Sequence, residues 1–111
     1  SGERSITEAI WVVLSTAPGE RVMHPEFGCG IQNLVFAPNS SATHAEVAHH
    51  VEEALLRFEP RIEVLDVRVA GEGDLDNVLL IAVDYRVRDN NTLNNLVYPF
   101  YITEGFARTG A

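Results

Sequence analysis

The last third of the chain alternates between apolar and polar residues, and this pattern constrains the fold more than any other feature. From Val78 to Val87 one face of an extended chain collects five apolar residues: Leu79, Ile81, Val83, Tyr85 and Val87. After a polar connection, residues 88–91, the alternation returns with Leu96, Tyr98, Phe100 and Ile102. A period of two predicts half-buried strands. Because the connection is so short, the two strands must be antiparallel.

A further strand is predicted upstream, from Ile62 to Val69. Its apolar phase changes between Val64 and Leu65, which predicts a bulge. The polar residues 71–74 then begin a loop, so the three strands form an antiparallel meander. Pro99 lacks the amide proton that a central strand donates, so we expect the last strand to lie at an edge or to be interrupted. An open edge can recruit a partner.

Two amphipathic helices precede the strands. Ser5 and a glutamate three residues later have the spacing of a capping box, and the apolar stripe that follows predicts a helix from about Ile6 to Thr16. Pro18 cannot continue that helix. A second helix is predicted from about Ser41 to Phe58, since Pro60 disfavours helical geometry in the residue before it.

The segment between the two helices contains several residues that fix the backbone. Pro25 sets its own φ, while Gly28 and Gly30 allow left-handed or closely approached conformations. Phe27 and the apolar residues after it supply anchors, so we expect an ordered structural loop that leads into a short helix from about Ile31 to Phe36. The predicted class is α+β, with two main helices and this short helix packed on the three-stranded antiparallel β-meander.

Length and charge exclude several classes of function. With 111 residues, of which 46% are hydrophobic, the chain is expected to form a single domain over residues 1–111, and an N-terminal extension is expected to be missing because the chain starts without methionine. Its net charge of -8 argues against nucleic acid or an anionic membrane surface as a partner. No apolar run reaches the roughly 18 residues of a membrane span. The single cysteine, Cys29, excludes an internal disulfide and favours a reducing compartment.

The candidate catalytic groups lack the arrangements that catalysis requires. The carboxylates of Glu26, Glu52, Glu53 and Glu59 show no spacing that indicates the positioned pair of a glycoside hydrolase. Cys29 and the four histidines form no paired-ligand motif for zinc, and no nucleophile elbow surrounds a serine. The glycines near the cysteine lack the strand–turn–helix fingerprint of a phosphate site. We therefore expect no enzyme activity, no metal and no cofactor.

The tripeptide Glu59-Pro60-Arg61 directly follows the second helix and has two interpretations. In the first, it is a helix stop whose charged side chains pair with each other or with water, which contributes about 0 to 1 kcal/mol when the pair is exposed. In the second, Pro60 rigidly presents a carboxylate and a guanidinium to a partner, and arginine can form bidentate charge-assisted bonds. Local chemistry favours the first, because exposed pairs are so common.

The order of these motifs resembles one known family. The stretch LSTAPGERVMHPEFGCGIQNLVF, the helix that enters FEPRIEV, and the meander after it resemble the baseplate-wedge, sheath-initiator family of contractile phage tails. Relatives of that family occur in contractile injection systems and type VI secretion. The resemblance runs from about Ser5 to Ile102. It implies that Glu59, Pro60 and Arg61 hold the helical core bundle of the wedge, and that the β-structure templates the first sheath ring.

The resemblance thus implies a structural baseplate component that joins the wedge to the sheath by strand addition. The implied partner-binding residues are those of the tripeptide and of the last strand: Glu59, Pro60, Arg61, Leu96, Tyr98, Pro99, Phe100 and Ile102. The expected partners are wedge proteins and the sheath subunit, with tube or hub proteins as further candidates, at six copies per baseplate. We expect assembly in the bacterial cytoplasm, after which the protein is part of the tail or injection particle.

Two other functions stay open. A relative of this fold acts as an anti-adaptor in bacterial stress control, so a cytosolic regulatory binding protein is the main alternative. Some members of the family carry a historical tail-lysozyme label, so a muralytic hydrolase is the third candidate, which the carboxylates do not support. Sheath, tube and spike genes beside this gene would favour assembly, whereas an isolated gene would favour regulation.

Overall fold

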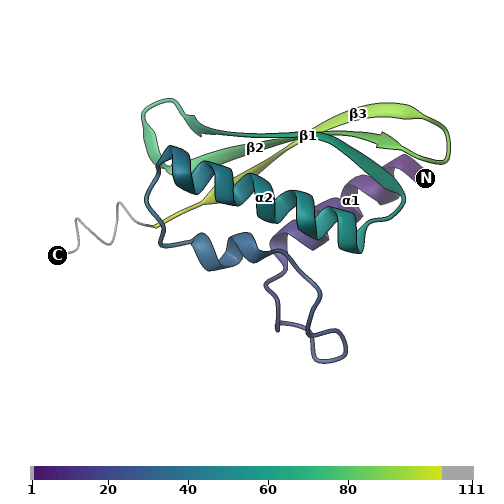
Figure 1. The fold of residues 1–111 in the computed structure, drawn as a ribbon, viewed down its shortest axis with the longest axis horizontal. Coiled ribbons are helices and arrows are strands. Elements are labelled where there is room, and N and C mark those ends of the chain that lie inside the picture. The colour runs from purple at the N-terminus through teal and green to yellow at the C-terminus, as the bar shows by residue number, and fades with distance from the viewer. Residues whose placement is uncertain (1, 104–111) are drawn as a thin grey trace.

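Helices and strands follow one another in the order that the sequence predicts. The computed structural model describes residues 2–103, in which a helical layer lies on one face of a sheet (Figure 1). The elements are α1 (Gly2–Ser15), the 3-10 helix η1 (Gly30–Leu34), α2 (Ser41–Phe58), β1 (Ile62–Glu72), β2 (Leu75–Val87) and β3 (Thr92–Tyr101). The predicted α+β fold, with two main helices and a short one on a three-stranded sheet, is confirmed.

The sheet is an antiparallel meander with the strand order β1-β2-β3. The register of β1 on β2 shifts between Val64 and Asp66, so the predicted bulge is confirmed. Strand β3 lies at an edge of the sheet and pairs with β2 without any shift in register. The edge position predicted from Pro99 is therefore confirmed as well.

Helix α2 has the predicted bounds, and its beginning is capped as helix physics requires. Ser40 is extended, and its side-chain oxygen accepts a hydrogen bond from the backbone N–H of Thr43. Helix α1, in contrast, begins at Gly2 rather than at Ile6. Ser5 therefore lies inside the helix and is no N-cap, because the residues before it include good helix formers that extend the helix by one turn.

Other predicted boundaries were wrong by a few residues. Strand β1 continues to Glu72 and β2 begins at Leu75, so the predicted polar loop shrinks to a tight turn. Gly73 makes this possible because its φ of 53° lies in the left-handed region. The short helix is a single 3-10 segment that ends at Leu34 and does not continue to Phe36.

The core lies between the helical layer and the inner face of the sheet. Helix α2 packs on β1 and on η1. Helix α1 reaches β2 and β3, since Thr7 lies within hydrogen-bond distance of the Tyr85 hydroxyl and Trp11 packs against Tyr98. Among the largest fully buried side chains are residues of the three helices and of the central strand β2: Ile10, Leu14, Ile31, Leu55, Leu79 and Ile81.

The loop between α1 and η1 is anchored by one close backbone approach. Gly28 has φ 134°, and a Cβ placed on it would lie 2.5 Å from the carbonyl oxygen of Thr16. The next residue, Cys29, donates its backbone N–H to that same oxygen at 2.9 Å. Gly30 faces the ring of His50 on α2, and Phe27 packs on Phe58. The loop therefore fastens the end of α1 to the side of α2.

We predict that Gly28→Ala destabilises the fold by at least about 3 kcal/mol, because it combines a left-handed backbone with a clash against backbone oxygen. Gly19→Ala is the matched control: Gly19 also has a positive φ, but no atom lies within 4 Å of its added Cβ, so the expected loss is about 1 to 2 kcal/mol. Urea unfolding of both variants measures the difference. Equal losses would contradict the role assigned to the close approach.

Candidate functional site

The tripeptide Glu59-Pro60-Arg61 forms a tight link between α2 and β1. The backbone N–H of Glu59 donates to Leu55 at 2.9 Å and ends the helix. The side chain of Glu59 is only 4% exposed, whereas that of Arg61 is 50% exposed. Arg61 Nε donates to Glu59 Oε2 at 2.7 Å and Arg61 Nη2 donates to Glu59 Oε1 at 3.0 Å. The first interpretation of the motif, an internal pair, therefore describes its geometry.

This pairing makes Glu59 a positioning residue for Arg61. A buried carboxylate is costly unless a cation and hydrogen bonds compensate it, so the guanidinium is held where Glu59 lies. The hydrogen bonds that Arg61 donates to Glu59 raise the pKa of Arg61, which keeps the guanidinium charged. Among the described residues no hydrogen bond involves Nη1, the third guanidinium nitrogen. Arg61 can therefore offer this nitrogen to a partner from a fixed position.

A second arginine secures the same corner. Arg88 lies in the turn between β2 and β3, where its Nε donates to the carbonyl oxygen of Pro60 at 3.1 Å. Its backbone N–H donates to the carbonyl oxygen of Arg61 at 2.9 Å. Two guanidinium groups thus lie at one corner of a chain whose net charge is -8. This corner is suited to carbonyl or carboxylate oxygens of a partner.

An apolar notch adjoins the corner on the side of β1. It encloses about 190 Å³ and is lined by residues of α2, β1 and the β2–β3 turn: Glu52, Leu56, Ile62, Glu63, Val64 and Arg88. Leu56 is 77% exposed, although it is a large apolar side chain on the polar face of α2. The sequence analysis did not identify Leu56 as a surface residue. Its position among charged residues at helical spacing could have indicated that it is exposed. Leu56 extends the candidate surface from the tripeptide onto the helix.

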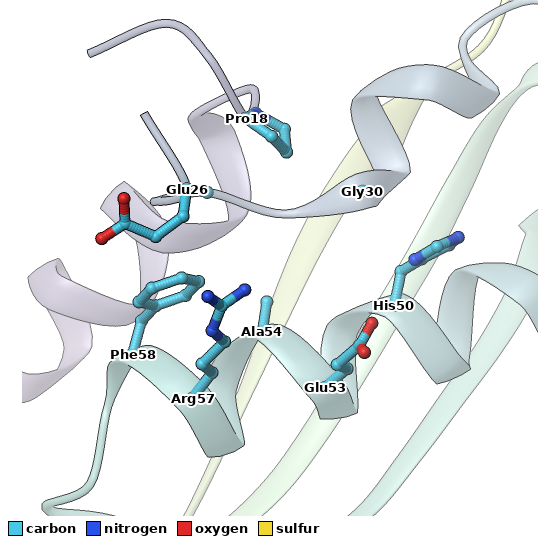
Figure 2. A pocket seen from close by; sticks show the side chains of 9 residues that line it. Pro18, Glu26, Gly30, His50, Glu53, Ala54, Arg57 and Phe58 are labelled. Carbon is cyan, nitrogen blue, oxygen red and sulfur yellow. The ribbon is translucent and has the colours of Figure 1, made fainter. Parts of the chain in front are cut away.

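On the other side of α2, a groove runs between the helix and the α1–η1 loop (Figure 2). It encloses about 330 Å³, and its walls include Pro18 and Glu26 from the loop, opposite His50, Glu53 and Arg57 from the helix. Figure 2 shows Glu26 and Glu53 toward opposite ends, with Arg57 between them. Both carboxylates are exposed to solvent. Neither has the apolar burial that keeps the acid catalyst of a hydrolase protonated.

The predicted residues of the last strand lie mainly in the core. Leu96, Tyr98 and Phe100 point inward from β3, and Ile102 is buried just beyond the end of the strand. Pro99 alone among the five is only half-buried, and it lies on the outer face of the sheet opposite Leu80. A partner of this strand would therefore meet mostly its backbone.

One aromatic residue at this strand was missed by the sequence analysis. Trp11 of α1 packs edge-on against Tyr98, with ring centroids 4.6 Å apart, and stays 40% exposed. A half-exposed tryptophan beside an edge strand is a common anchor in protein interfaces. The helical pattern offered no sign of this, because Trp11 lies next to the apolar stripe and looked like part of the helix surface.

Cys29 has no features of a reactive group. It is fully buried, and burial raises the pKa of its thiol to about 11. Its Sγ donates toward the carbonyl oxygen of His50 at 3.5 Å. A thiol in this state is protonated at neutral pH and is a poor nucleophile or metal ligand.

Within residues 2–103, no helix is both long and apolar enough to cross a membrane.

Comparisons with known proteins agree with this arrangement. A family model described as baseplate wedge protein gp25 matches residues 1–92. The baseplate wedge protein gp25 of Enterobacteria phage T4 is 34% identical over 89 residues, which cover 80% of this chain and 67% of that protein. A candidate tail lysozyme from Geobacter sulfurreducens has a TM-score of 0.86 and 48% identity, with 92% of each chain covered. A chain of the baseplate complex from the type VI secretion system shares the fold, with a TM-score of 0.73, 17% identity and coverage of 91% and 93%.

We predict that Arg61→Ala destabilises the free protein by about 1 to 3 kcal/mol, because it leaves the buried carboxylate of Glu59 unpaired. The loss is limited because Arg61 itself is half-exposed. Adding Glu59→Gln to this variant should recover at least half of the loss, since the unpaired charge is then removed. Arg57→Ala is the control, because Arg57 stacks on Phe58 and has no ion pair within the described residues. Chemical unfolding of the four proteins tests this, and a double variant no more stable than Arg61→Ala would contradict it.

Proposed function

Because the chain belongs to the baseplate wedge protein gp25 family, we propose that it joins the wedge core bundle to the first sheath ring. The protein is a structural baseplate component of a contractile tail or injection system. In the proposal it has no enzyme activity, and it templates sheath assembly by strand addition. Its proposed partners are wedge proteins and the sheath subunit, with tube or hub proteins nearby, and six copies form part of each baseplate. Assembly takes place in the bacterial cytoplasm.

The observation that carries the wedge contact is the geometry of Arg61. Glu59 accepts hydrogen bonds from two guanidinium nitrogens of Arg61, and Nη1 has no hydrogen bond among the described residues, while Arg88 binds the carbonyl oxygen of Pro60. A side chain that is already ordered loses less conformational entropy when it binds. The two interpretations of the motif are therefore compatible, because the internal pair prepares the arginine for a partner. A bundle of helices offers free carbonyl oxygens at its C-terminal ends and carboxylates on its surface, both of which suit this nitrogen.

Burial and hydrogen bonding also support a structural role over hydrolysis. Both oxygens of Glu59 accept hydrogen bonds from Arg61, so neither is available to give a proton to a glycosidic oxygen. The exposed carboxylates of Glu26 and Glu53 lie in an open groove on the far side of the helix. The name tail lysozyme belongs to the Geobacter protein. Among the described residues of this chain, no acid catalyst supports a lysozyme activity.

We predict that Arg61→Lys weakens binding to the purified wedge core bundle at least about tenfold. Lysine keeps the charge, but its single ammonium group cannot bind Glu59 and a partner in the geometry of a planar guanidinium. The variant should stay within about 1 kcal/mol of the parent in stability, since Glu59 keeps a cation. Arg57→Lys serves as the control on the neighbouring helix face. Calorimetric titration measures the affinities, and equal binding by all three proteins would contradict the proposed role of Arg61.

We further predict that the pure protein releases no soluble fragments from peptidoglycan under conditions in which an established muramidase does. The physical reason is that Arg61 occupies both oxygens of Glu59, and that the carboxylates of Glu26 and Glu53 in the groove are exposed. Turnover that disappears in Glu59→Gln but persists in Glu26→Gln would contradict the non-enzymatic assignment.

A further inference from the structure

The sheet has two open edges within the described residues, and they differ in how well they can receive another strand. Strand β1 is interrupted by the bulge at Leu65, and the side chain of Asn39 comes within 3.6 Å of the Cβ position of Gly71 near its end. Strand β3 pairs with β2 from Thr92 to Tyr101 without any shift in register. Bulges protect edges from unwanted pairing, so β3 is the better template.

The hydrogen bonds at the end of β3 show which backbone groups face the open edge. Ile102 lies beyond the last ladder pair, opposite Asn77, and donates its N–H to the Asn77 carbonyl at 2.9 Å. Bonded and unbonded pairs alternate in antiparallel ladders. The even-numbered residues from Asn94 to Ile102 therefore bond to β2. The odd-numbered residues direct their N–H and C=O groups away from the sheet.

A second bond at the opposite end of the sheet gives the same assignment. Arg88 donates its backbone N–H to the carbonyl of Arg61, so the even-numbered residues of β2 bond to β1. The odd-numbered residues of β2 are then left for β3, and in the register Tyr85 lies opposite Asn94 and Val83 opposite Leu96. The two ends of the sheet thus agree on which residues of β3 face outward.

Pro99 is one of these outward-facing residues. Its nitrogen would point to the open edge, so its missing N–H costs no bond to β2, which explains how proline fits into an otherwise regular strand. On its N-terminal side, Leu93, Asn95 and Val97 each offer an outward N–H and an outward C=O. Asn91, with φ 58°, turns the chain away before them. The usable template is thus short and has a defined end.

The side chains along this template indicate what kind of strand fits. On the outer face, Leu93 is 68% exposed and Val97 is 48% exposed. Between them, Asn95 is held by a hydrogen bond of 2.6 Å to Asp84 and needs no partner. On the inner face, Trp11 lies against Tyr98 beside the edge. A strand placed here would cover apolar surface on both of its faces.

We propose that the open edge of β3 binds one partner strand of about five to seven residues, paired with Leu93, Asn95 and Val97, and that Pro99 ends the pairing. The partner strand carries apolar side chains on both faces, and Trp11 anchors an inward one. This inference rests on the proposed function, in which the sheath subunit adds a strand. Beyond that function, it specifies which edge of the sheet binds the strand, which residues pair with it and where the pairing ends.

Backbone amide exchange, followed by NMR with and without the purified sheath subunit of the same particle, tests the proposal. In the free protein, the amides of Asn95 and Val97 should exchange at least about tenfold faster than those of Leu96 and Tyr98, because they lack ladder bonds. In the complex, Asn95 and Val97 should become protected, while Tyr101 beyond Pro99 should not.

Two pairs of variants separate the backbone from the side chains. Val97→Pro removes one outward N–H and no bond to β2, so it should fold and bind at least about tenfold more weakly, whereas Val97→Ala keeps the N–H and should lose much less. Pro99→Ala restores an outward N–H and should extend protection to Tyr101. Trp11→Ala should weaken binding, while Ser15→Ala, one turn further along the same exposed helix face, should not.

The outcomes distinguish this inference from the function on which it rests. Protection on β1, or protection that passes Pro99 in the parent protein, would overturn the inference and leave strand addition standing. Sheath binding without protection at either edge would overturn strand addition itself. A doubled mass together with edge protection in the absence of sheath would identify a second copy as the occupant, which also overturns the proposal.

Discussion

The sheet is covered by helices on one face only, and this constraint determines most of what the molecule can do. The inward positions from Leu79 to Val87 in β2 and from Leu96 to Phe100 in β3 are apolar, and a slip of one residue would expose the whole set to water. The alternation that turns every second side chain inward also determines which backbone groups bond to the neighbouring strand. In β3 the inward residues, such as Leu96 and Tyr98, are those that bond to β2, so the outward residues are those whose N–H and C=O groups remain open. The packing of the core thereby fixes the chemistry of the edge.

The corner around Glu59 shows how an internal interaction can prepare an external one. A carboxylate that is 4% exposed has to be paired, and Arg61 pairs with it through two nitrogens. A residue that only stopped the helix would not need this burial, and a free surface arginine would have to be ordered at each binding event. Because Arg88 also holds Pro60, the corner joins α2, β1 and the β2–β3 turn. Arg61 is therefore fixed to the sheet through its own backbone, which leads directly into β1, and through the bond from Arg88 to its carbonyl oxygen.

The sequence predicted the elements well because each has a local physical signal. The helix stop before Pro60, the change of phase at Leu65 and the edge position of Pro99 each depend on the geometry of one or two residues. The start of α1 was missed because a capping box at Ser5 is a weak signal when good helix formers precede it. Strand ends were missed because Gly73 closes a tighter turn than polarity indicates.

The candidate site was harder to predict because it depends on burial, which a single sequence does not contain. The residues of the tripeptide were evident, but the burial of Glu59, and with it the fixed position of Arg61, is set by packing at the end of α2. Trp11 was missed for the same reason, since its exposed contact with Tyr98 is visible only once the fold is known, whereas the charged neighbours of Leu56 could have indicated its exposure. The contrast between the two edges extends this argument. On β1, a bulge and the charged cluster of Arg68 with Asp66 and Asp84, in which Arg68 holds the pKa of Asp84 below its usual range, disfavour pairing. On β3, Asn91 and Pro99 bound the stretch that can pair, and Pro99 stands past the middle of the strand, so one short template stays open.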